Sequence, residues 1–207
     1  MCGIAGILSA SAASAPDAEE LLRMIAVLRH RGPDGYGLYR DAFVALGHAR
    51  LSIVDLSGGA QPMSNEDGSL WVTFNGEIFN HVELRAELEQ FGHRFQTRCD
   101  TEIIVHAYEQ WGQDAWLRFN GQFAFALWDA QRRRLWLVRD RLGILPLYYA
   151  RVDARMFFAS EPKALFAAGP ISPRLDAAGV VQAFTRWSAT APRTVFEGVA
   201  SVQPAGV

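Results

Sequence analysis

Pairs of short apolar segments joined by polar turns constrain the fold of this 207-residue chain more than any other feature. FAFALW and LWLV flank DAQRRR, and PLYYA precedes MFFAS after a short gap. Each pair predicts an antiparallel hairpin. Ile4 to Leu8 is typical of a short buried strand, and the short apolar runs from Tyr36 to Val54 and in LWVTFNGEIF predict an earlier group of antiparallel strands.

Helical periodicity lies between these strand groups and after them. Asp17 is a predicted N-cap, Glu20 completes a capping-box pattern, and apolar residues at helical spacing follow from Leu21 to Leu28. Further helices are predicted at 81–91, at 101–118, from Pro162 in a first turn, and around 177–187. Two strand groups with helices between and after them predict an α+β fold in which helices cover the sheets.

Composition excludes several classes of protein. Half of the residues are apolar and the net charge is -2, which predicts one sizeable core and argues against a nucleic-acid binder. No apolar run approaches the roughly 18 residues of a membrane helix, and the apolar N-terminal stretch lacks the basic flank of a secretory signal. We therefore expect a cytoplasmic protein. Cys2 and Cys99 cannot build a disulfide framework, and the five histidines show no metal-ligand spacing.

Cys2 lies directly after the initiator methionine, in MCGIAGI. Cysteine is among the most buried residue types, so a small core residue is one interpretation. Removal of Met1 would give Cys2 a free α-amino group. Such groups titrate at about pH 7.7 to 8.0 and could accept the thiol proton directly or through one water. Position 2 by itself leaves packing and nucleophilic catalysis open.

Two glycine-containing stretches each have a local and a functional interpretation. HRGPDGYG, which contains Arg31 and Gly32, is either a helix stop with a Pro-Asp-Gly turn or a loop that lets backbone approach a ligand. FNGEIFN contains Asn75 and Gly76, a pair that predicts a hairpin turn or, alternatively, two donors for a developing oxyanion. Neither stretch decides between its interpretations by itself.

Arg50 and Asp100 carry opposite charges in RLSIVD and CDTE. Arg50 is either a surface arginine or a bidentate partner for a carboxylate. Asp100 is either the N-cap of the helix that starts at Thr101 or the partner of an ammonium group. A free amino acid presents both a carboxylate and an ammonium group, so the two charges are consistent with one ligand.

Taken in order, these stretches closely resemble the glutaminase domain of class II glutamine amidotransferases of the asparagine synthetase B type. The matching segments, within about residues 2–166, are MCGIAGI, RHRGPDG, GHARLSIVD, FNGEIFNH, CDTEIIVHAY, FNGQFAFALWD, VRDRLGILPLYY and ASEPKAL. Phe79, Cys99 and Leu145 stand where the family usually has Tyr, Ser and Lys, and none of these three positions is assigned to chemistry.

The resemblance implies an N-terminal nucleophile hydrolase fold, an αββα sandwich with two antiparallel sheets between helical layers. It implies that Cys2, after loss of Met1, attacks the side-chain amide of L-glutamine, releases ammonia and forms a γ-glutamyl thioester that water hydrolyses. The other implied roles are an oxyanion hole at Asn75 and Gly76, carboxylate binding at Arg50, amino-group binding at Asp100 and Glu77, pocket backbone at Leu51, Ser52, Ile53 and Val54, and a closing loop at Arg31 and Gly32.

The resemblance implies no metal or cofactor for this domain, which we place at residues 2–190, with 191–207 as the start of a linker. Family members continue into a synthetase domain whose Ser-Gly-Gly-x-Asp-Ser motif serves ATP- and magnesium-dependent activation of an acceptor carboxylate, and this motif is absent here. The expected partners are L-glutamine and a synthetase domain or subunit that receives ammonia, with a homodimer left open. The chain is accordingly expected to be a truncated product or a split subunit.

Three alternatives remain. The first is an amidotransferase that tailors a polysaccharide or secondary metabolite. The second is a glutamine-sensing or partner-docking module without turnover, which a lost nucleophile would favour, whereas Cys2 is present. The third is a Cys-His amidase or protease, and no histidine stands in a motif that supports it.

Overall fold

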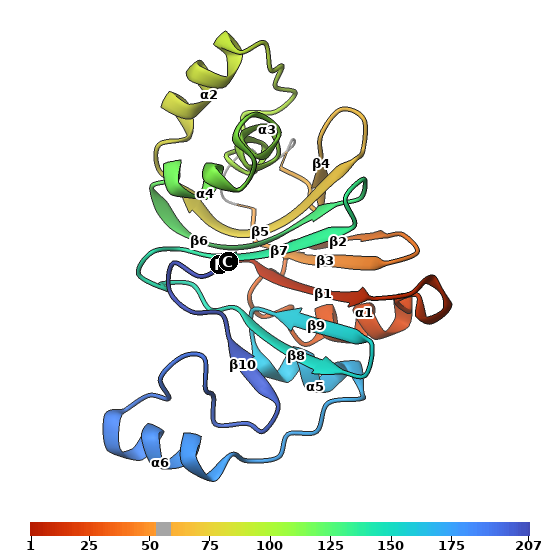
Figure 1. Cartoon of the computed structure of the whole chain (residues 1–207), viewed down its shortest axis with the longest axis vertical. Coiled ribbons are helices and arrows are strands. Elements are labelled where there is room, and N and C mark those ends of the chain that lie inside the picture. Colours follow the sequence, from red (N-terminus) through yellow and green to blue (C-terminus); the bar gives the residue numbers. More distant parts are fainter. Residues whose placement is uncertain (53–58) are drawn as a thin grey trace.

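The computed structural model describes residues 1–52 and 59–207, and its strands form two antiparallel sheets (Figure 1). The six-stranded sheet has the order β10-β8-β9-β1-β3-β2 and the four-stranded sheet the order β4-β5-β6-β7. The strands of the first are β1 (Gly3–Ser9), β2 (Gly35–Arg40), β3 (Val44–Arg50), β8 (Tyr148–Val152), β9 (Arg155–Ala159) and β10 (Val199–Ser201). Those of the second are β4 (Met63–Ser64), β5 (Leu70–Ile78), β6 (Gly121–Asp129) and β7 (Arg134–Arg139).

Helices cover the outer face of each sheet (Figure 1). The six-stranded sheet packs against α1 (Ala18–Ala26) and α5 (Pro162–Ala168), and the four-stranded sheet packs against α2 (His81–Gln90), α3 (Thr101–Trp111) and α4 (Ala115–Arg118). Short 3₁₀ turns lie at Ala12–Ser14 and Gly112–Asp114, and α6 (Ala177–Arg186) lies beyond β10. This order of layers confirms the predicted αββα sandwich.

The apolar runs are explained by burial on both faces of a strand. In FAFALW, which is residues 123–128 of β6, the aromatic and leucine side chains at odd positions face α2, α3 and α4. The even positions face the other sheet. Because successive side chains of a strand point to opposite faces, a strand between two apolar layers reads as an unbroken apolar run. The hairpins of β6 with β7 and of β8 with β9 are formed as predicted.

Two helix predictions need correction. The side chain of Asp17 accepts a hydrogen bond from the Glu19 N–H at 3.1 Å and caps α1 as predicted. The carboxylate of Glu20 instead pairs with Arg155 of β9 at 2.6 Å, so the predicted capping box is replaced by a tertiary ion pair. The helix predicted over 101–118 is interrupted at Gly112, whose φ of 58° ends α3 before α4 begins.

The C-terminal residues pack against the sandwich. Strand β10 pairs with β8, and the Ala205 N–H donates to the Asp140 carbonyl at 2.9 Å. The Arg139 guanidinium donates to the Val202 carbonyl at 2.8 Å. The domain boundary at residue 190 remains a prediction. Across the described ranges, each helix is too short or too polar to cross a lipid bilayer.

Strand ends from both sheets meet at one place in the sandwich. At the start of β1, Gly3 pairs with Ala49 near the end of β3. The Thr73 hydroxyl of β5 donates to the Gly47 carbonyl of β3 at 3.1 Å and ties the two sheets together there. The segments MCGIAGI, GHARLS and FNGEIFN are therefore neighbours in space.

Candidate active site

A cavity of about 160 Å³ lies where these strand ends meet. Most of the predicted site residues line it, namely Cys2, Arg50, Leu51, Asn75, Gly76, Glu77 and Asp100. Met1, His48, Gln61 and Thr101 also line it. Arg31, Gly32 and Ser52 do not line it, and Ile53 and Val54 lie outside the described residues. The cavity therefore gathers most of the residues expected to act on one ligand.

The Cys2 thiol is held against the backbone just after β3. Its Sγ donates to the Leu51 carbonyl at 3.6 Å and accepts from the Leu51 N–H at 3.4 Å. Cys2 is partly buried, because β1 lies in the centre of the six-stranded sheet between β3 and β9. Position 2 is therefore a fixed point at the head of a central strand.

Cys99 also lines the cavity, but its environment favours the protonated thiol. It is buried and donates to the Thr101 hydroxyl at 3.1 Å. Burial raises the pKa of Cys99. Because the thiolate is the nucleophilic form, this environment makes Cys99 a poor nucleophile.

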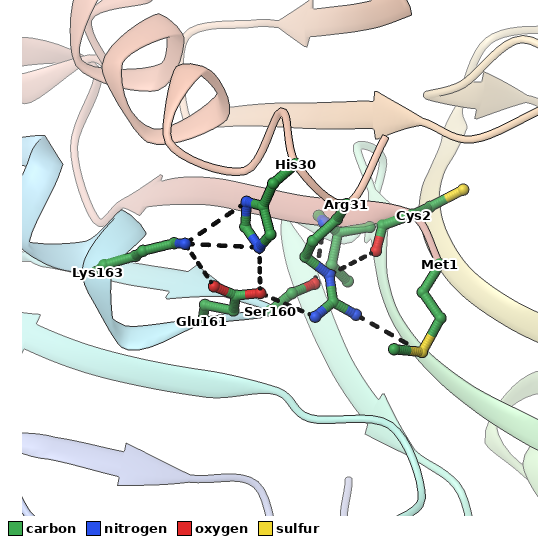
Figure 2. Close-up of polar contacts among 8 residues, drawn as sticks. Met1, Cys2, His30, Arg31, Ser160, Glu161 and Lys163 are labelled. Carbon is green, nitrogen blue, oxygen red and sulfur yellow. Dashed lines mark hydrogen bonds and ion pairs between the residues drawn. The ribbon is translucent and has the colours of Figure 1, made fainter. Parts of the chain in front are cut away.

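Arg31 links the start of β1 to the start of α5 (Figure 2). Its guanidinium donates to the Cys2 carbonyl at 2.9 Å, to Glu161 at 2.9 Å and to the Met1 sulfur at 3.9 Å. Glu161 also contacts His30 at 2.9 Å and Lys163 at 3.0 Å. Burial of this carboxylate opposes its ionisation, but the hydrogen bonds from Arg31, Lys163 and His30 outweigh burial and lower the pKa of Glu161 to about 2.

The HRGPDG loop packs against the end of β3. Gly32 in this loop lies so close to the β3 backbone that a side chain would not fit. A Cβ atom on Gly32 would lie 2.2 Å from the Ala49 carbonyl oxygen. The Asp34 N–H donates to the Arg50 carbonyl at 3.0 Å, and the Asp34 carboxylate accepts from the Ser52 N–H at 2.8 Å. This loop therefore fixes the backbone at the end of β3.

Asn75 and Gly76 lie within β5, so the hairpin interpretation of this pair is wrong. Asn75 is 1% exposed, and its Nδ2 atom has no hydrogen-bond partner among the described residues. Gly76 has a φ of 151°, and a Cβ there would lie 2.3 Å from the Gln122 carbonyl oxygen of β6. Tertiary pairing with β6 thus overrides the local turn preference and leaves an unpaired amide donor in the cavity wall.

Asp100 occupies the N-cap position of α3 without capping it through its side chain. Its carboxylate instead accepts from the Ile78 N–H at the end of β5, at 2.9 Å. Burial raises the pKa of Asp100, although the Ile78 hydrogen bond acts in the opposite direction. Glu77 lies near enough to raise this pKa further by charge repulsion. A ligand ammonium group would relieve both the desolvation and the repulsion.

His48 and Gln61 are two polar residues of the cavity wall that the sequence analysis did not assign to the site. His48 is 1% exposed, and neither of its ring nitrogens has a hydrogen-bond partner among the described residues. Burial lowers the pKa of His48 to about 4, although the nearby Phe74 backbone acts in the opposite direction, and the Arg50 charge adds a smaller lowering effect. The alternation of β3 places His48 on the face of Arg50, so period-two counting could have found it.

Gln61 is the second missed residue. Its side chain accepts from the Phe74 N–H at 2.7 Å and donates to the Thr101 hydroxyl at 3.2 Å. Gln61 therefore joins β5 to the start of α3, and no periodic sequence signal marks that role.

Comparison with solved structures identifies the fold. The chain superimposes on a glutamine phosphoribosylpyrophosphate amidotransferase from B. subtilis with a TM-score of 0.66 and 23% identity, over 81% of this chain and 44% of that one. It superimposes on the allosteric regulatory enzyme of purine biosynthesis with a TM-score of 0.68 and 24% identity, over 81% and 43%. The sandwich is the N-terminal nucleophile hydrolase fold, as predicted.

Sequence comparison identifies the family. Residues 1–207 match the glutamine amidotransferase domain family, and the chain belongs to it. It is 36% identical to Asparagine synthetase [glutamine-hydrolyzing] 3 of Bacillus subtilis, over 99% of this chain and 34% of the relative. Asparagine synthetase [glutamine-hydrolyzing] 2 of Oryza sativa is 44% identical over 80% of this chain and 28% of the relative. The chain thus spans about a third of the length of these relatives.

Proposed function

We propose that this chain hydrolyses the side-chain amide of L-glutamine with Cys2 as an N-terminal nucleophile. The observation that carries the proposal is that one cavity is lined by a thiol and by a buried amide donor that has no partner within residues 1–52 and 59–207. Asn75 Nδ2 is that donor, and a preorganised donor is what a developing oxyanion requires. Membership of the glutamine amidotransferase domain family supports the choice of substrate.

Removal of Met1 prepares the nucleophile in this proposal. Met1 itself lines the cavity, so its loss both frees the α-amino group of Cys2 and opens space beside the thiol. The α-amino group accepts the thiol proton, directly or through one water. The Arg31 hydrogen bond to the Cys2 carbonyl and the two Leu51 contacts hold the residue in place during this transfer.

The proposed reaction has two steps. Cys2 Sγ attacks the amide carbon, and the oxyanion receives hydrogen bonds from Asn75 Nδ2 and the Gly76 N–H. The carbon–nitrogen bond then breaks, ammonia leaves with the proton held by the α-amino group, and a γ-glutamyl thioester remains. Water, deprotonated by the same α-amino group, hydrolyses the thioester to glutamate and restores the thiol.

Charged groups in the cavity wall support recognition of an amino acid. Arg50 is proposed to bind the α-carboxylate, and Asp100 with Glu77 to bind the α-ammonium group. The backbone of Leu51 contributes to the wall. Contributions from Ser52, Ile53 and Val54 remain predictions.

The acceptor of ammonia is proposed from the relatives. They are glutamine-hydrolysing asparagine synthetases of about three times this length, so we propose that a synthetase domain or subunit receives the ammonia and uses ATP and magnesium.

On and after α6, Val181, Phe184 and Trp187 are 60%, 84% and 95% exposed. Such an apolar surface supports contact with that domain. Homodimer formation remains a prediction.

Glutamine hydrolysis by purified protein without Met1 tests this proposal. We expect release of ammonia and glutamate from glutamine and loss of both in Cys2→Ala. If Cys2→Ala hydrolyses glutamine as fast as the parent, Cys2 is not the nucleophile. Saturable glutamine binding without any ammonia release would instead support the sensing module.

A further inference from the structure

A second cluster of ligand-type side chains lies outside the candidate active site. His106 and Glu109 are one turn apart on α3, and His93 lies in the loop of residues 91–100 that joins α2 to α3 (Figure 1). One ligand atom from each residue lies within 4.8 Å of the other two. Glu109 Oε2 is 3.1 Å from His106 Nδ1 and 3.5 Å from His93 Nδ1.

In each of these three side chains, the second polar atom contacts another polar group outside the cluster. The outer pairs are His106 Nε2 with Glu102 Oε1 at 3.7 Å, His93 Nε2 with Gln110 Oε1 at 3.1 Å, and Glu109 Oε1 with Asn65 Nδ2 at 2.8 Å. The outer partners leave Nδ1 of each histidine and Oε2 of Glu109 facing one point. Metal ligands in proteins are typically oriented by outer partners of this kind.

The donor set selects a class of cation. Two imidazoles with one carboxylate suit Zn²⁺, whose four-coordinate sites often use three protein ligands and one water. Mg²⁺ and Ca²⁺ prefer oxygen ligands throughout. The His106 side chain is 2% exposed and that of Glu109 is 27% exposed, so the cluster is shielded on one side and open to an arriving ion on the other.

We propose that His93, His106 and Glu109 bind one Zn²⁺ ion, which fixes the 91–100 loop to α3. Ideal tetrahedral ligation places ligand atoms roughly 3.3 Å apart, close to the 3.1 and 3.5 Å from Glu109 Oε2 to the two histidine Nδ1 atoms. The protons now shared within the cluster leave to solvent when the metal binds. The loop ends at Asp100 in the cavity wall, so the ion would stiffen the segment that positions this carboxylate.

Zinc titration of the full chain tests this site. The parent for the titration is Cys2→Ala, because a thiol beside a free α-amino group is a competing zinc ligand. After treatment with a chelator, calorimetry with ZnCl₂ should show one equivalent bound and a rise in the unfolding temperature. Adding His93→Ala or Glu109→Gln should abolish both effects, and adding Glu102→Gln should weaken binding by about 10- to 100-fold.

Two matched variants control for general changes in charge and histidine content. Adding His30→Ala or Glu19→Gln, both distant in sequence from His93 and α3, should leave the stoichiometry and affinity unchanged. Co²⁺ in place of zinc should give the visible absorption of a four-coordinate ion, a readout that depends on no variant.

The proposal is overturned by any of three results. These are no saturable zinc binding to the Cys2→Ala parent, equal binding after the His93→Ala or Glu109→Gln substitution, or a cobalt spectrum of a six-coordinate aqueous ion. In each of these cases the cluster is held by hydrogen bonds and ion pairs alone.

Discussion

Asn75→Ala should separate catalysis from stability. A buried donor without a partner costs about 1 to 3 kcal/mol, and Asn75 Nδ2 is such a donor among the described residues. Alanine removes this cost, and the truncation enlarges an open cavity rather than leaving a sealed void. We therefore expect the free energy of unfolding to stay within about 1 kcal/mol of the parent. Loss of the proposed oxyanion donor should lower kcat by about 10²- to 10³-fold.

Asn80→Ala is the matched control, because both ends of the Asn80 amide are hydrogen-bonded. Its Nδ2 donates to the Arg118 carbonyl at 3.0 Å, and its Oδ1 accepts from the Asn120 N–H at 2.9 Å. Losing these bonds should lower the free energy of unfolding by about 1 to 2 kcal/mol without changing kcat. Urea unfolding measures the first quantity, and ammonia release at saturating glutamine measures the second.

The reasoning on Asn75 is refuted by either of two results. The first is an unchanged kcat in Asn75→Ala, which would remove the residue from the oxyanion hole. The second is a loss of stability equal to that of Asn80→Ala, which would show that the Asn75 amide is paired in the folded protein.

Four further predictions concern charge and backbone. Asp100→Asn keeps an acceptor for the Ile78 N–H but loses the charge, so the KM for glutamine should rise by about 10- to 100-fold. Burial raises the pKa of Asp100, and the ammonium group binds the ionised carboxylate. On acidification, the KM of the parent should therefore begin to rise at a higher pH than it would with an exposed aspartate. A KM that does not change with pH would contradict this. Gly76→Ala should lower the Tm more than Gly68→Ala does. A Cβ at Gly76 would meet the β6 backbone, whereas a Cβ at Gly68 would meet nothing within 4 Å. Equal Tm values would count against close packing of Gly76 on β6. The pKa of Glu161 is lowered from 4.5 to about 2, so its ionised form stabilises the fold above about pH 4.5 and this stabilisation is lost as the pH falls towards 2. Glu161→Gln should flatten that part of the acid unfolding profile, and an unaltered profile would contradict the ion-pair account.

Local periodicity predicted most elements of the fold, because each strand and helix is buried on a defined face. The alternating environments of FAFALW and the helical spacing from Leu21 to Leu28 are both visible in the chain. The strand order is not, since it depends on which long-range pairs are most stable together. The placement of β1 between β3 and β9 is such a case, and it turns Cys2 from a terminal residue into a fixed one.

Predictions from neighbouring residues were wrong where the side chain or backbone of a residue takes part in a tertiary contact instead of the local cap or turn. Glu20 forms an ion pair with Arg155 instead of the predicted capping box. Asp100 accepts a hydrogen bond from the Ile78 N–H instead of capping α3. The Asn-Gly pair stays within β5 because this strand pairs with β6 on both sides of it, and β6 leaves no room for a side chain at Gly76. Two of these departures, at Asp100 and at the Asn-Gly pair, lie in the cavity wall, where side chains are positioned by elements far away in sequence.

The proximity of His93, His106 and Glu109 could not be predicted from their spacing. The loop of residues 91–100 places His93 beside α3. The conformation of that loop depends on tertiary contacts that exist only in the folded chain. The Glu102 carboxylate, for example, accepts from the Gln96 and Thr97 N–H groups at 2.7 and 2.8 Å.

Mass spectrometry of the protein during glutamine turnover tests the role of Cys2 most directly. We predict that the protein lacks Met1 and that rapid acid quenching traps one γ-glutamyl group on Cys2, which is absent from Cys2→Ala and disappears when glutamine is exhausted. Turnover by protein that retains Met1, or a γ-glutamyl group on any residue other than Cys2, would contradict the N-terminal nucleophile mechanism.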